Sequence, residues 1–500
     1  MRVKALAMSF LIATSIQAQS ISTAAWAEDS TASQPAGASE AWRKKPPEAP
    51  APRPFHLPKI ESFKLPNGLS VQLVEDHRYP LVTMALGLKV GSSIDPSKKR
   101  GVASLTAQML TEGTKKKTSK QIADEVDFIG GGLKAGADND FTILSSSVLS
   151  KYTDRLIAVF EDVLFNPTFP QAEFDLKKAN LIQELAMKRS NPDFLLEERF
   201  AKVIFGEHPY SSIAPTPESV KSITRADLEA FHKANYLPNE SALVVIGDFD
   251  SAKIRPLISK DFSEQWKPGR IAKTDAQSMP TRTEQRIYLV DRPGSVQSNI
   301  KMGNVGIKRT DPDYYALTLA NQILGGAANS RLFLNLREAK SFTYGAYSGV
   351  AAGKEPGSFG AEASVRTEVT APSLQEFFYE LSRIRNLKVT DKELNEAKKY
   401  LTGSFQLGLE TQGGLAQRLL EGQLYDLPRD YLETYTDKVM AVSADDVRNV
   451  ARKHIDLGHI AITVVGDAKV IKPELQIFGP VDVYDVSGKV STESKSENPG

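Results

Sequence analysis

Histidine and cysteine most often hold catalytic metals or act as nucleophiles, and this chain is poor in both. It has six histidines and no cysteine, which excludes Cys-ligated zinc, a thiol nucleophile and disulfides. No two histidines stand four apart, the spacing that places two imidazoles on one face of a helix. His454 and His459 are five apart and flank the start of an apolar segment, so we expect both at the surface. The sequence therefore predicts no self-contained His-based metal site, and no metal in this chain.

Two further classes of binding function are excluded by composition and motif. The chain has 62 basic and 61 acidic residues, so it has no net charge that would favour nucleic acid or an anionic membrane. Gly325-Gly326 is not followed by the Lys-Ser/Thr pair of a phosphate-binding loop. We interpret this glycine pair as the turn that ends a helix.

Both ends of the chain differ in composition from its middle. Residues 1–27 combine a basic start, an apolar stretch and the small-x-small sequence Ala25-Trp26-Ala27, which is typical of a cleaved signal peptide. An apolar core of about a dozen residues is too short to span a bilayer. Residues 28–58 are rich in Pro and Ala and predict an extended linker, and residues 481–500 predict a flexible tail. We therefore expect an exported protein without stable membrane insertion.

The middle of the chain is duplicated. One offset of 219 residues relates Asp227 to Asp446 and Gly247 to Gly466, and each match lies in a similar local sequence. In both copies a capping box opens a helix, which is followed by a buried apolar strand and a Gly-Asp turn. A repeat of about 220 residues is far longer than a solenoid unit and indicates a duplicated domain.

Each copy predicts the same order of strands and helices. Hairpin-like strands come first, then a helix (about 101–112 and 311–324), further strands, longer helices and a final apolar strand. This order favours an α+β fold in which helices cover one face of a mostly antiparallel sheet. We predict an N-terminal domain at 59–270, a linker at 271–283 and a C-terminal domain at 284–480.

Several short motifs carry a family resemblance over nearly the whole mature chain. They are Leu65-Pro66-Asn67-Gly68-Leu69, Gly101-Val102-Ala103, Met109-Leu110, Gly113-Thr114, Gly130-Gly131-Gly132, Asn166-Pro167 and His208-Pro209-Tyr210. With them the chain resembles the pitrilysin-like (M16, inverzincin) zinc peptidases. The resemblance implies two homologous domains of the mitochondrial-processing-peptidase/LuxS-like kind, paired in the shape of a clam.

The zinc motif of that family is degenerate in this sequence. In the family the first helix carries His-x-x-Glu-His, which supplies two zinc ligands and the base that activates water. Those three positions are occupied by Ser104, Ala107 and Gln108. Serine and glutamine are poor ligands for zinc, and alanine cannot accept a proton.

The other acidic positions of the family's metal site are only partly kept. The third ligand corresponds to Glu184, and the supporting glutamate seven residues earlier is replaced by Lys177. One carboxylate cannot hold zinc, which needs about three protein ligands. We therefore expect Glu184 to be an ordinary helix carboxylate.

The second half keeps a different part of the family's active site. The sequence Ser330-Arg331-Leu332-Phe333, followed by Leu336-Arg337-Glu338 and Phe342-Thr343-Tyr344, matches the family's second-domain motif. The resemblance implies that Tyr344 donates to the developing oxyanion and that Arg337 holds the substrate backbone. The alternative is that Arg337 is an exposed helix residue and Tyr344 only begins a strand.

A chain with the Arg/Tyr pair but without the zinc motif resembles one subunit of the bacterial heterodimers in this family. The resemblance implies a partner, a zinc-bearing M16 paralogue, which would supply the metal for peptide hydrolysis. An edge strand at Gly132 to Thr142, or its counterpart in the second half, would pair with an extended peptide substrate. The signal peptide and the resemblance together predict a periplasmic or secreted protein of a Gram-negative bacterium.

Two other functions remain open from the sequence. The chain could be a structural or peptide-binding scaffold with no part in catalysis, which would have no reason to keep Arg337 and Tyr344. It could also be an independently active peptidase, which would need a metal site built from other residues. Stoichiometric zinc in the isolated protein would favour that last alternative.

Overall fold

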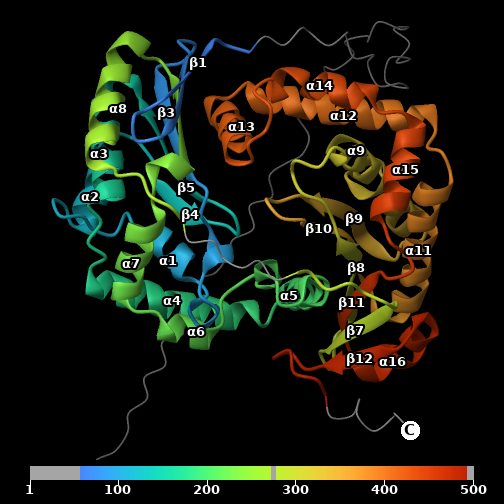
Figure 1. The fold of residues 1–500 in the computed structure, drawn as a ribbon. Coiled ribbons are helices and arrows are strands. Elements are labelled where there is room, and N and C mark those ends of the chain that lie inside the picture. The colour runs from blue at the N-terminus through green and yellow to red at the C-terminus, as the bar shows by residue number, and fades with distance from the viewer. Residues whose placement is uncertain (1–56, 272–277, 492–500) are drawn as a thin grey trace, which may run out of the picture. The chain divides into compact units, whose positions relative to one another are not determined.

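The duplication appears in the computed structural model as two six-stranded sheets with corresponding strand orders (Figure 1). The structure describes residues 57–271 and 278–491, so the predicted signal peptide and nearly all of the 28–58 linker lie outside the described residues. The first sheet has the order β1 (Ile60–Lys64), β2 (Ser70–Glu75), β6 (Ser241–Gly247), β3 (Leu81–Leu88), β5 (Thr142–Leu149) and β4 (Lys134–Ala137). The second has the order β12 (Val481–Tyr484), β7 (Arg286–Asp291), β11 (Ala461–Gly466), β8 (Gln297–Val305), β10 (Ser358–Arg366) and β9 (Thr343–Ala351).

Most neighbouring strands in these sheets are antiparallel, as predicted. The parallel pairs are β2–β6 in the first sheet, and β7–β11 and β7–β12 in the second. The tail predicted to begin at residue 481 is wrong at its start, because Val481–Tyr484 forms β12 alongside β7. Tyr484 also bridges to Val490. Side chains alternate between the two faces of this short strand, and Val483 lies on the buried face. The polar residues around it made this strand hard to predict from the sequence.

Helices are interspersed with the strands in each half, which completes the predicted α+β fold. Those of the first half are α1 (Val102–Met109), α2 (Ser119–Phe128), α3 (Thr153–Phe165), α4 (Gln171–Lys188), α5 (Pro192–Phe205), α6 (Pro217–Ser222), α7 (Arg225–Asn235) and α8 (Ser251–Gln265). Those of the second half are α9 (Tyr314–Gly325), α10 (Arg331–Phe333), the π-helix η7 (Leu334–Ala339), α11 (Thr370–Asn386), α12 (Asp391–Leu409), α13 (Gln412–Leu424), α14 (Tyr431–Ala441), α15 (Ala444–His454) and α16 (Ala468–Leu475).

The predicted helix ends form for the expected local reasons. Ser443 Oγ accepts a hydrogen bond from the amide of Asp446 at 3.1 Å, and the Asp446 carboxylate accepts the amide of Ser443 at 2.8 Å. The Asp227 carboxylate accepts the amide of Thr224 at 2.8 Å in the equivalent position. These bonds satisfy N–H groups that have no partner inside the helix. Gly326 ends α9, as predicted for the glycine pair.

One helix of each half packs on the sheet of the other half. Helix α5 contacts β8 and β11 of the second sheet, and α13 contacts β3 and β6 of the first (Figure 1). Glycine permits both close approaches: a Cβ at Gly87 would lie 2.7 Å from a methyl of Leu424, and one at Gly303 would lie 2.8 Å from the ring of Phe200. The two halves are thus joined by an exchange of equivalent helices.

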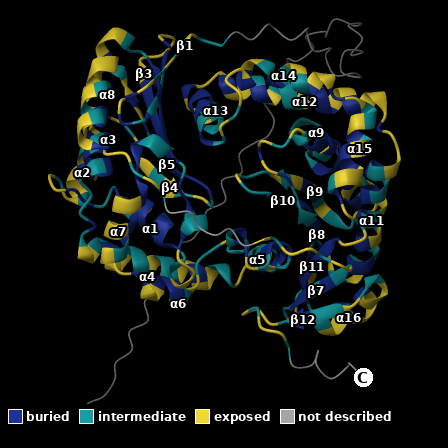
Figure 2. Cartoon of the chain, viewed as in Figure 1, coloured by how far each residue is buried: buried dark blue, intermediate teal, exposed yellow. Residues whose placement is uncertain are grey.

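This exchange explains why the central strands are buried on both faces. In β6, Leu243 and Val245 belong to the core of the first half, whereas Val244 and Ile246 belong to the core that includes α13. The prediction that helices cover one face of each sheet holds for the helices that stay with their own half. The helix exchanged from the other half covers the opposite face. Figure 2 shows largely buried strands and helices exposed on one side.

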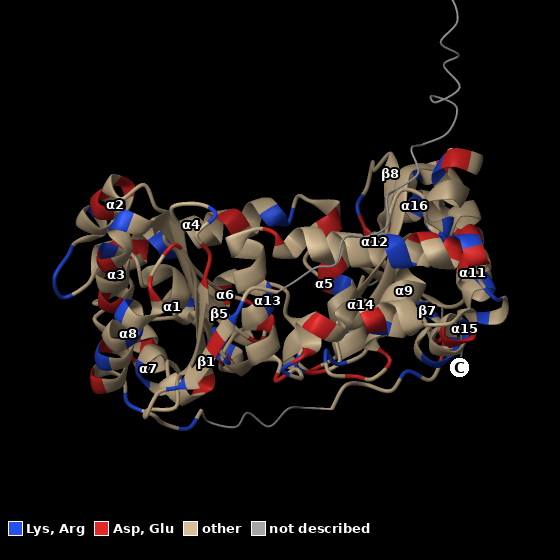
Figure 3. Ribbon diagram, turned by 90° about the horizontal axis from the view of Figure 1, so that it is seen from above, with Lys and Arg blue, Asp and Glu red and all other residues tan. Residues whose placement is uncertain are grey.

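Charged residues of both signs are interspersed along the helices, as the ribbon of Figure 3 shows for α2, α3 and α11. This distribution agrees with the balanced composition and presents no stripe of one sign in that view. Among the helices that the structure describes, none combines the length and apolar character needed to cross a membrane.

Candidate functional site

Helix α1, which carries the degenerate zinc-motif positions, is held by an aspartate at its N-terminus. Asp95 accepts hydrogen bonds from the amides of Gly101, at 2.6 Å, and Ala103, at 3.0 Å. Gly101 has φ +103°, which a residue with a side chain rarely adopts. Burial raises the pKa of Asp95 to about 6 despite these backbone hydrogen bonds. Asp95 therefore fixes the start of α1, a role that its sequence context did not indicate.

The three degenerate positions differ in their surroundings. Ser104 is partly buried and lines a pocket of about 350 Å³ together with Asp95 and Asp138. Ala107 is fully buried in the core beneath α1, and Gln108 points to solvent. A glutamate side chain in place of Ala107 would have to fit among closely packed core residues, and such an insertion usually destabilises a core. This helix is therefore built as a structural element.

The remaining acidic position of the motif lies apart from any ligand set. The side chain of Glu184 is 57% exposed and pairs with Lys188 at 2.8 Å, one turn along the same helix. Lys177 pairs with Glu112 at 2.9 Å and so ties α4 to the end of α1. Zinc needs about three N, O or S ligands from the protein. The residues at the motif positions do not fit zinc, and no catalytic step can be assigned to them.

A second group of potential metal ligands lies elsewhere, in the second half. Asp311, Asp313 and His454 place three ligand atoms within 4.8 Å of one another. The ammonium of Lys453 lies 2.6 Å from Asp313 and already supplies a positive charge there. His454 accepts or donates at 2.7 Å to the same carboxylate and is only 13% exposed, so its predicted surface position is wrong. It packs under the loop before α9, whereas His459 is exposed as predicted.

Arg337 lies on the π-helix η7, next to strand β9. Its guanidinium is 46% exposed and makes two weak local contacts, with Glu338 at 3.5 Å and with the ring of Phe333 at 4.8 Å from the centroid. Single π-helical turns occur often at functional sites. The helix ends in a C-terminal turn, in which the carbonyl of Arg337 accepts the amide of Ser341 at 3.0 Å and Ser341 has φ +56°.

Tyr344 lies on β9, an edge strand of the second sheet that pairs with β10 on one side, and its side chain is 88% exposed. Pairing with β10 slips by one residue here, since Ala346 faces Ala363 but Thr343 faces Val365. Tyr344 and Gly345 therefore form a β-bulge, a feature that changes the direction of a side chain. No other described residue accepts or donates a hydrogen bond to the Tyr344 hydroxyl. Its exposure requires an explanation other than packing.

A partly buried ion pair anchors the segment that carries Arg337. Arg331, at the start of α10, donates to both carboxylate oxygens of Glu393, at 2.7 and 3.0 Å. Burial acts to raise the pKa of Glu393, but the hydrogen bonds and charge of Arg331 outweigh it and hold the pKa at about 2. Bidentate pairing fixes the geometry of both side chains. The sequence motif contained Arg331, but nothing marked Glu393 as its partner.

The His208-Pro209-Tyr210 motif ties the two halves together. Tyr210 donates to Asp140 Oδ1 at 2.5 Å, and the amide of Lys354 donates to Asp140 Oδ2 at 2.9 Å. The amide of Glu355 donates to the Tyr210 hydroxyl at 3.1 Å. Burial, followed by the hydrogen bond to Asp140, raises the pKa of Tyr210 well above its usual range. The loop between β9 and β10 is thus fixed to the first half by buried hydrogen bonds.

Each sheet ends in an edge strand whose outer side is unpaired, as predicted for the segment Gly132 to Thr142. Strand β4 is the edge of the first sheet next to β5, and β9 is its counterpart in the second. Edge strands present free N–H and C=O groups that can pair with an added chain. Arg337 and Tyr344 thus lie at one open edge, and Ser104 lies beside the loop that joins the strands at the other.

Comparison with known proteins gives this geometry a context. Residues 70–218 match the family profile described as insulinase (peptidase family M16), and residues 222–401 match the peptidase M16 inactive domain. An uncharacterized zinc protease of Streptomyces coelicolor is 25% identical over 84% of this chain and 90% of its own length. The uncharacterized zinc protease YmxG of Bacillus subtilis is 24% identical over 79% of this chain and 95% of its own length.

Solved structures show the same fold. The crystal structure of a peptidase M16 inactive domain from Pseudomonas fluorescens has a TM-score of 0.76 and is 28% identical, covering 81% of this chain and 98% of that chain. A protease from Helicobacter pylori also has a TM-score of 0.76, at 22% identity, covering 82% of this chain and 100% of that chain. The two profiles together match most of the described residues. The resemblance found in the sequence is confirmed: this chain belongs to the M16 peptidase family.

Proposed function

We propose that this chain is the zinc-less subunit of a periplasmic M16 peptidase. It supplies Tyr344, Arg337 and a peptide-binding edge to a zinc-bearing M16 paralogue, and that partner provides the metal. The peptide substrate is held between the two subunits. The degenerate motif at Ser104, Ala107 and Gln108 leaves the hydrolytic chemistry to the partner.

The exposure of Tyr344 is the observation that carries this proposal. A large aromatic residue that is 88% exposed on an edge strand contributes little to the stability of its own chain. The bulge at Tyr344 and Gly345 directs the side chain away from regular sheet packing. A phenol hydroxyl without an internal partner can donate to a substrate oxyanion when a second subunit covers this edge.

Arg337 supports the same assignment. Its contacts with Glu338 and Phe333 are local and weak, so its end-on N–H donors are free to bind a peptide carbonyl or carboxylate. The partly buried pair Arg331–Glu393 holds the helix that presents it. A chain that served only as a scaffold would gain nothing from this rigid support beneath an exposed arginine.

The unpaired edges of β4 and β9 are suited to an extended substrate. A peptide that adds to a sheet edge gains main-chain hydrogen bonds, and alternate side chains then fall on opposite faces. Unfolded peptides can adopt this conformation, whereas folded proteins cannot. We therefore infer that short or unfolded peptides are the substrates. The export pattern at residues 1–27 supports a periplasmic location.

Reconstitution tests the proposal. This chain is co-expressed with a zinc-bearing M16 protein that has an intact His-x-x-Glu-His motif, preferably one encoded beside it, and the purified material is assayed for peptide cleavage and zinc content. We expect a complex in which only the partner carries zinc and in which both chains are needed for full activity. Stoichiometric zinc in this chain alone, or full activity of the partner alone, would contradict the proposal.

A further inference from the structure

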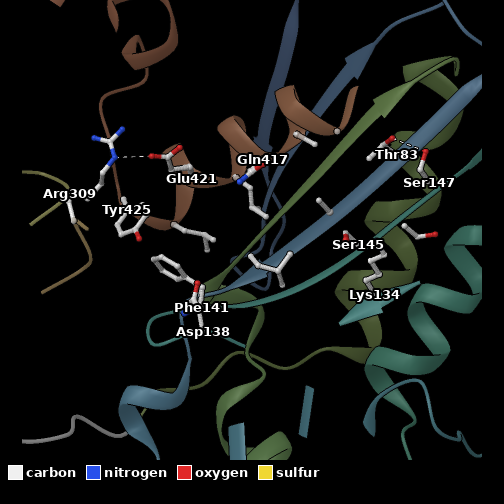
Figure 4. A pocket seen from close by; sticks show the side chains of 18 of the residues that line it. Thr83, Lys134, Asp138, Phe141, Ser145, Ser147, Arg309, Gln417, Glu421 and Tyr425 are labelled. Atoms are coloured by element: carbon white, nitrogen blue, oxygen red, sulfur yellow. Dashed lines mark hydrogen bonds and ion pairs between the residues drawn. The ribbon is translucent and has the colours of Figure 1, made fainter. Parts of the chain in front are cut away.

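A pocket of about 810 Å³ lies between the first sheet and helix α13, apart from Tyr344 and Arg337. Its volume is in the range of pockets that bind small molecules or a few residues of a peptide. It is lined by residues of the edge region of the first sheet, by one face of α13, by the loop before α9 and by the end of β9. Figure 4 shows Arg309, Glu421 and Tyr425 at one end, and Lys134, Ser145 and Ser147 at the other.

The Arg309 end of the pocket carries a buried guanidinium that is only partly satisfied. Arg309 is 5% exposed, its Nε donates to Glu421 Oε1 at 2.8 Å, and its flat face lies 3.9 Å from the Tyr314 ring centroid. Among the described residues, neither of its two terminal nitrogens has a hydrogen-bond partner. Neither nitrogen is one of the fully buried side-chain atoms that lack a partner, so both are accessible and can donate to a ligand.

Two carboxylates line the pocket: Glu421, which accepts a hydrogen bond from Arg309, and Asp138, which lies beside Phe141 (Figure 4). Glu421 is shared, because its second oxygen accepts a hydrogen bond from Arg418 at 2.8 Å. Burial acts to raise the pKa of Glu421, but the two arginines outweigh it and hold the pKa below its usual range. Glu421 thus divides its two oxygens between Arg309 and Arg418, so neither guanidinium has a carboxylate to itself. A guanidinium whose Nε is engaged still offers two parallel N–H donors, the geometry that a carboxylate accepts.

The wall beside Arg309 is apolar. Phe141 and Tyr425 meet edge to face with ring centroids 4.8 Å apart, and Leu424 and Val350 line the same region. The far end is polar and opens toward edge strand β4 through Lys134 and Ser145. The pocket therefore combines a site for a carboxylate, an apolar surface next to it, and a polar exit along an unpaired strand.

We propose that this pocket binds the C-terminal end of a short peptide. The free α-carboxylate lies on the terminal nitrogens of Arg309, and the apolar side chain of the last residue packs against Phe141 and Tyr425. The preceding main chain runs toward the edge of β4. This site binds rather than reacts, and it does not depend on Tyr344, on Arg337 or on a partner subunit.

Binding of matched peptides to the isolated wild-type chain tests the proposal directly. The probe is an N-terminally fluorescent pentapeptide, Gly-Gly-Gly-Leu-Phe, prepared as the free acid and as the C-terminal amide, and affinity is measured by fluorescence anisotropy. We expect the amide to bind at least about tenfold more weakly, since a hydrogen-bonded charge is lost. Equal affinity of acid and amide would overturn the proposal.

A third peptide separates the two possible sources of a carboxylate. Gly-Gly-Gly-Leu-Glu amide carries its carboxylate on the last side chain, and we expect it to bind no better than the Phe amide. If it binds as tightly as the free acid, the pocket does not recognise a peptide C-terminus, and the proposal is wrong.

Two variants locate the site. Arg309→Lys keeps the positive charge but loses the paired N–H donors, so it should reduce the preference for acid over amide. Gln417→Trp, on the exposed face of α13, should block the pocket and weaken binding of the free-acid peptide at least about tenfold. Arg225→Lys, an exposed substitution on α7, is the matched control and should change the affinity for neither the free-acid peptide nor the amide. Wild-type discrimination that persists in Gln417→Trp would overturn the assignment to this pocket.

Discussion

The hydroxyl of Thr343 donates a hydrogen bond to the main-chain oxygen of Ser364 at 2.6 Å, across the bulge that presents Tyr344. The amide of Gly345 donates to the same hydroxyl oxygen at 3.1 Å. Thr343 thus bonds to both sides of the irregular pair between β9 and β10. This side chain, which the sequence motif contains without an assigned role, sets the backbone from which Tyr344 points outward.

Replacement of Thr343 by valine should therefore reduce catalysis without changing the fold. Valine keeps the branched shape but removes the hydroxyl, so the bulge loses its hydrogen bonds and Tyr344 loses its fixed direction. We expect kcat of the assembled peptidase to fall about 10- to 100-fold with little change in KM. Thr343→Ser retains the hydroxyl and should keep most of the activity. Equal activity of the valine and serine variants would show that Thr343 has no positioning role.

Loss of the Tyr210–Asp140 hydrogen bond should destabilise the protein. Tyr210→Phe removes a buried donor to a carboxylate and the acceptor for the amide of Glu355. A hydrogen bond to a charged group contributes about 1.5–3 kcal/mol, and we expect a loss of that size in the free energy of unfolding. Urea unfolding measures it. Tyr79→Phe, at a position that is 60% exposed, is the control and should change stability by less than about 0.5 kcal/mol.

The pH dependence of stability should contain a contribution from Glu161. Burial, and then the neighbouring charge of Asp261, raises the pKa of Glu161 from 4.5 to about 7. Between these values the folded state binds more protons than the unfolded state, so the free energy of unfolding falls as pH rises from 4.5 to 7. Above pH 7 the free energy of unfolding has lost the whole contribution of Glu161.

Glu161→Gln removes this titration and should stabilise the protein at pH 8 by about 1–3 kcal/mol relative to the wild type. At pH 4.5 the two proteins should differ much less, because the wild-type side chain is then largely protonated when folded. Thermal unfolding at both pH values checks the prediction. The exposed substitution Asp127→Asn should show no such difference between the two pH values. A Glu161→Gln variant that is no more stable at pH 8 would contradict the assignment.

The degenerate motif predicts that metal removal leaves the isolated chain unaffected. Dialysis against a chelator should not change its midpoint of thermal unfolding, because Ser104, Ala107 and Gln108 do not form a zinc site. Ser104→His together with Gln108→His places two imidazoles four residues apart on α1, where both positions are accessible. This double variant should bind Co²⁺ with a visible absorption spectrum, whereas either single variant should not. A chelator-dependent shift in the wild type would show that zinc does bind.

The fold followed from the sequence because its signals are local and repeated. The duplicated capping boxes at Thr224 and Ser443, and the apolar strands after them, depend on neighbours a few residues away. The exchange of α5 and α13 could not be predicted in this way. The amphipathic pattern of a helix does not indicate which sheet the helix covers. The role of Gly87 and Gly303 becomes clear only in the structure, where Leu424 and Phe200 lie against them.

The candidate site shows the same division. The motif identified Arg337 and Tyr344. Their exposure depends on the bulge that Thr343 fixes by its bond to Ser364, and on the Arg331–Glu393 pair, which joins residues 62 apart. Arg309 carried no sequence signal, since its partner Glu421 lies 112 residues away. His454 was misplaced for the same reason, because its partner Asp313 precedes it by 141 residues. Long-range pairs of polar residues are what the sequence alone did not provide.

The most direct test of the central claim is kcat of the two-chain peptidase with Tyr344→Phe in this chain. Loss of one oxyanion donor typically lowers kcat by about 10²- to 10³-fold, and we expect a fall of that order with unchanged complex formation. Tyr347→Phe, on the same strand and 44% exposed, is the matched control and should retain full activity. A Tyr344→Phe complex as active as the wild type would contradict the account and leave this chain as a scaffold.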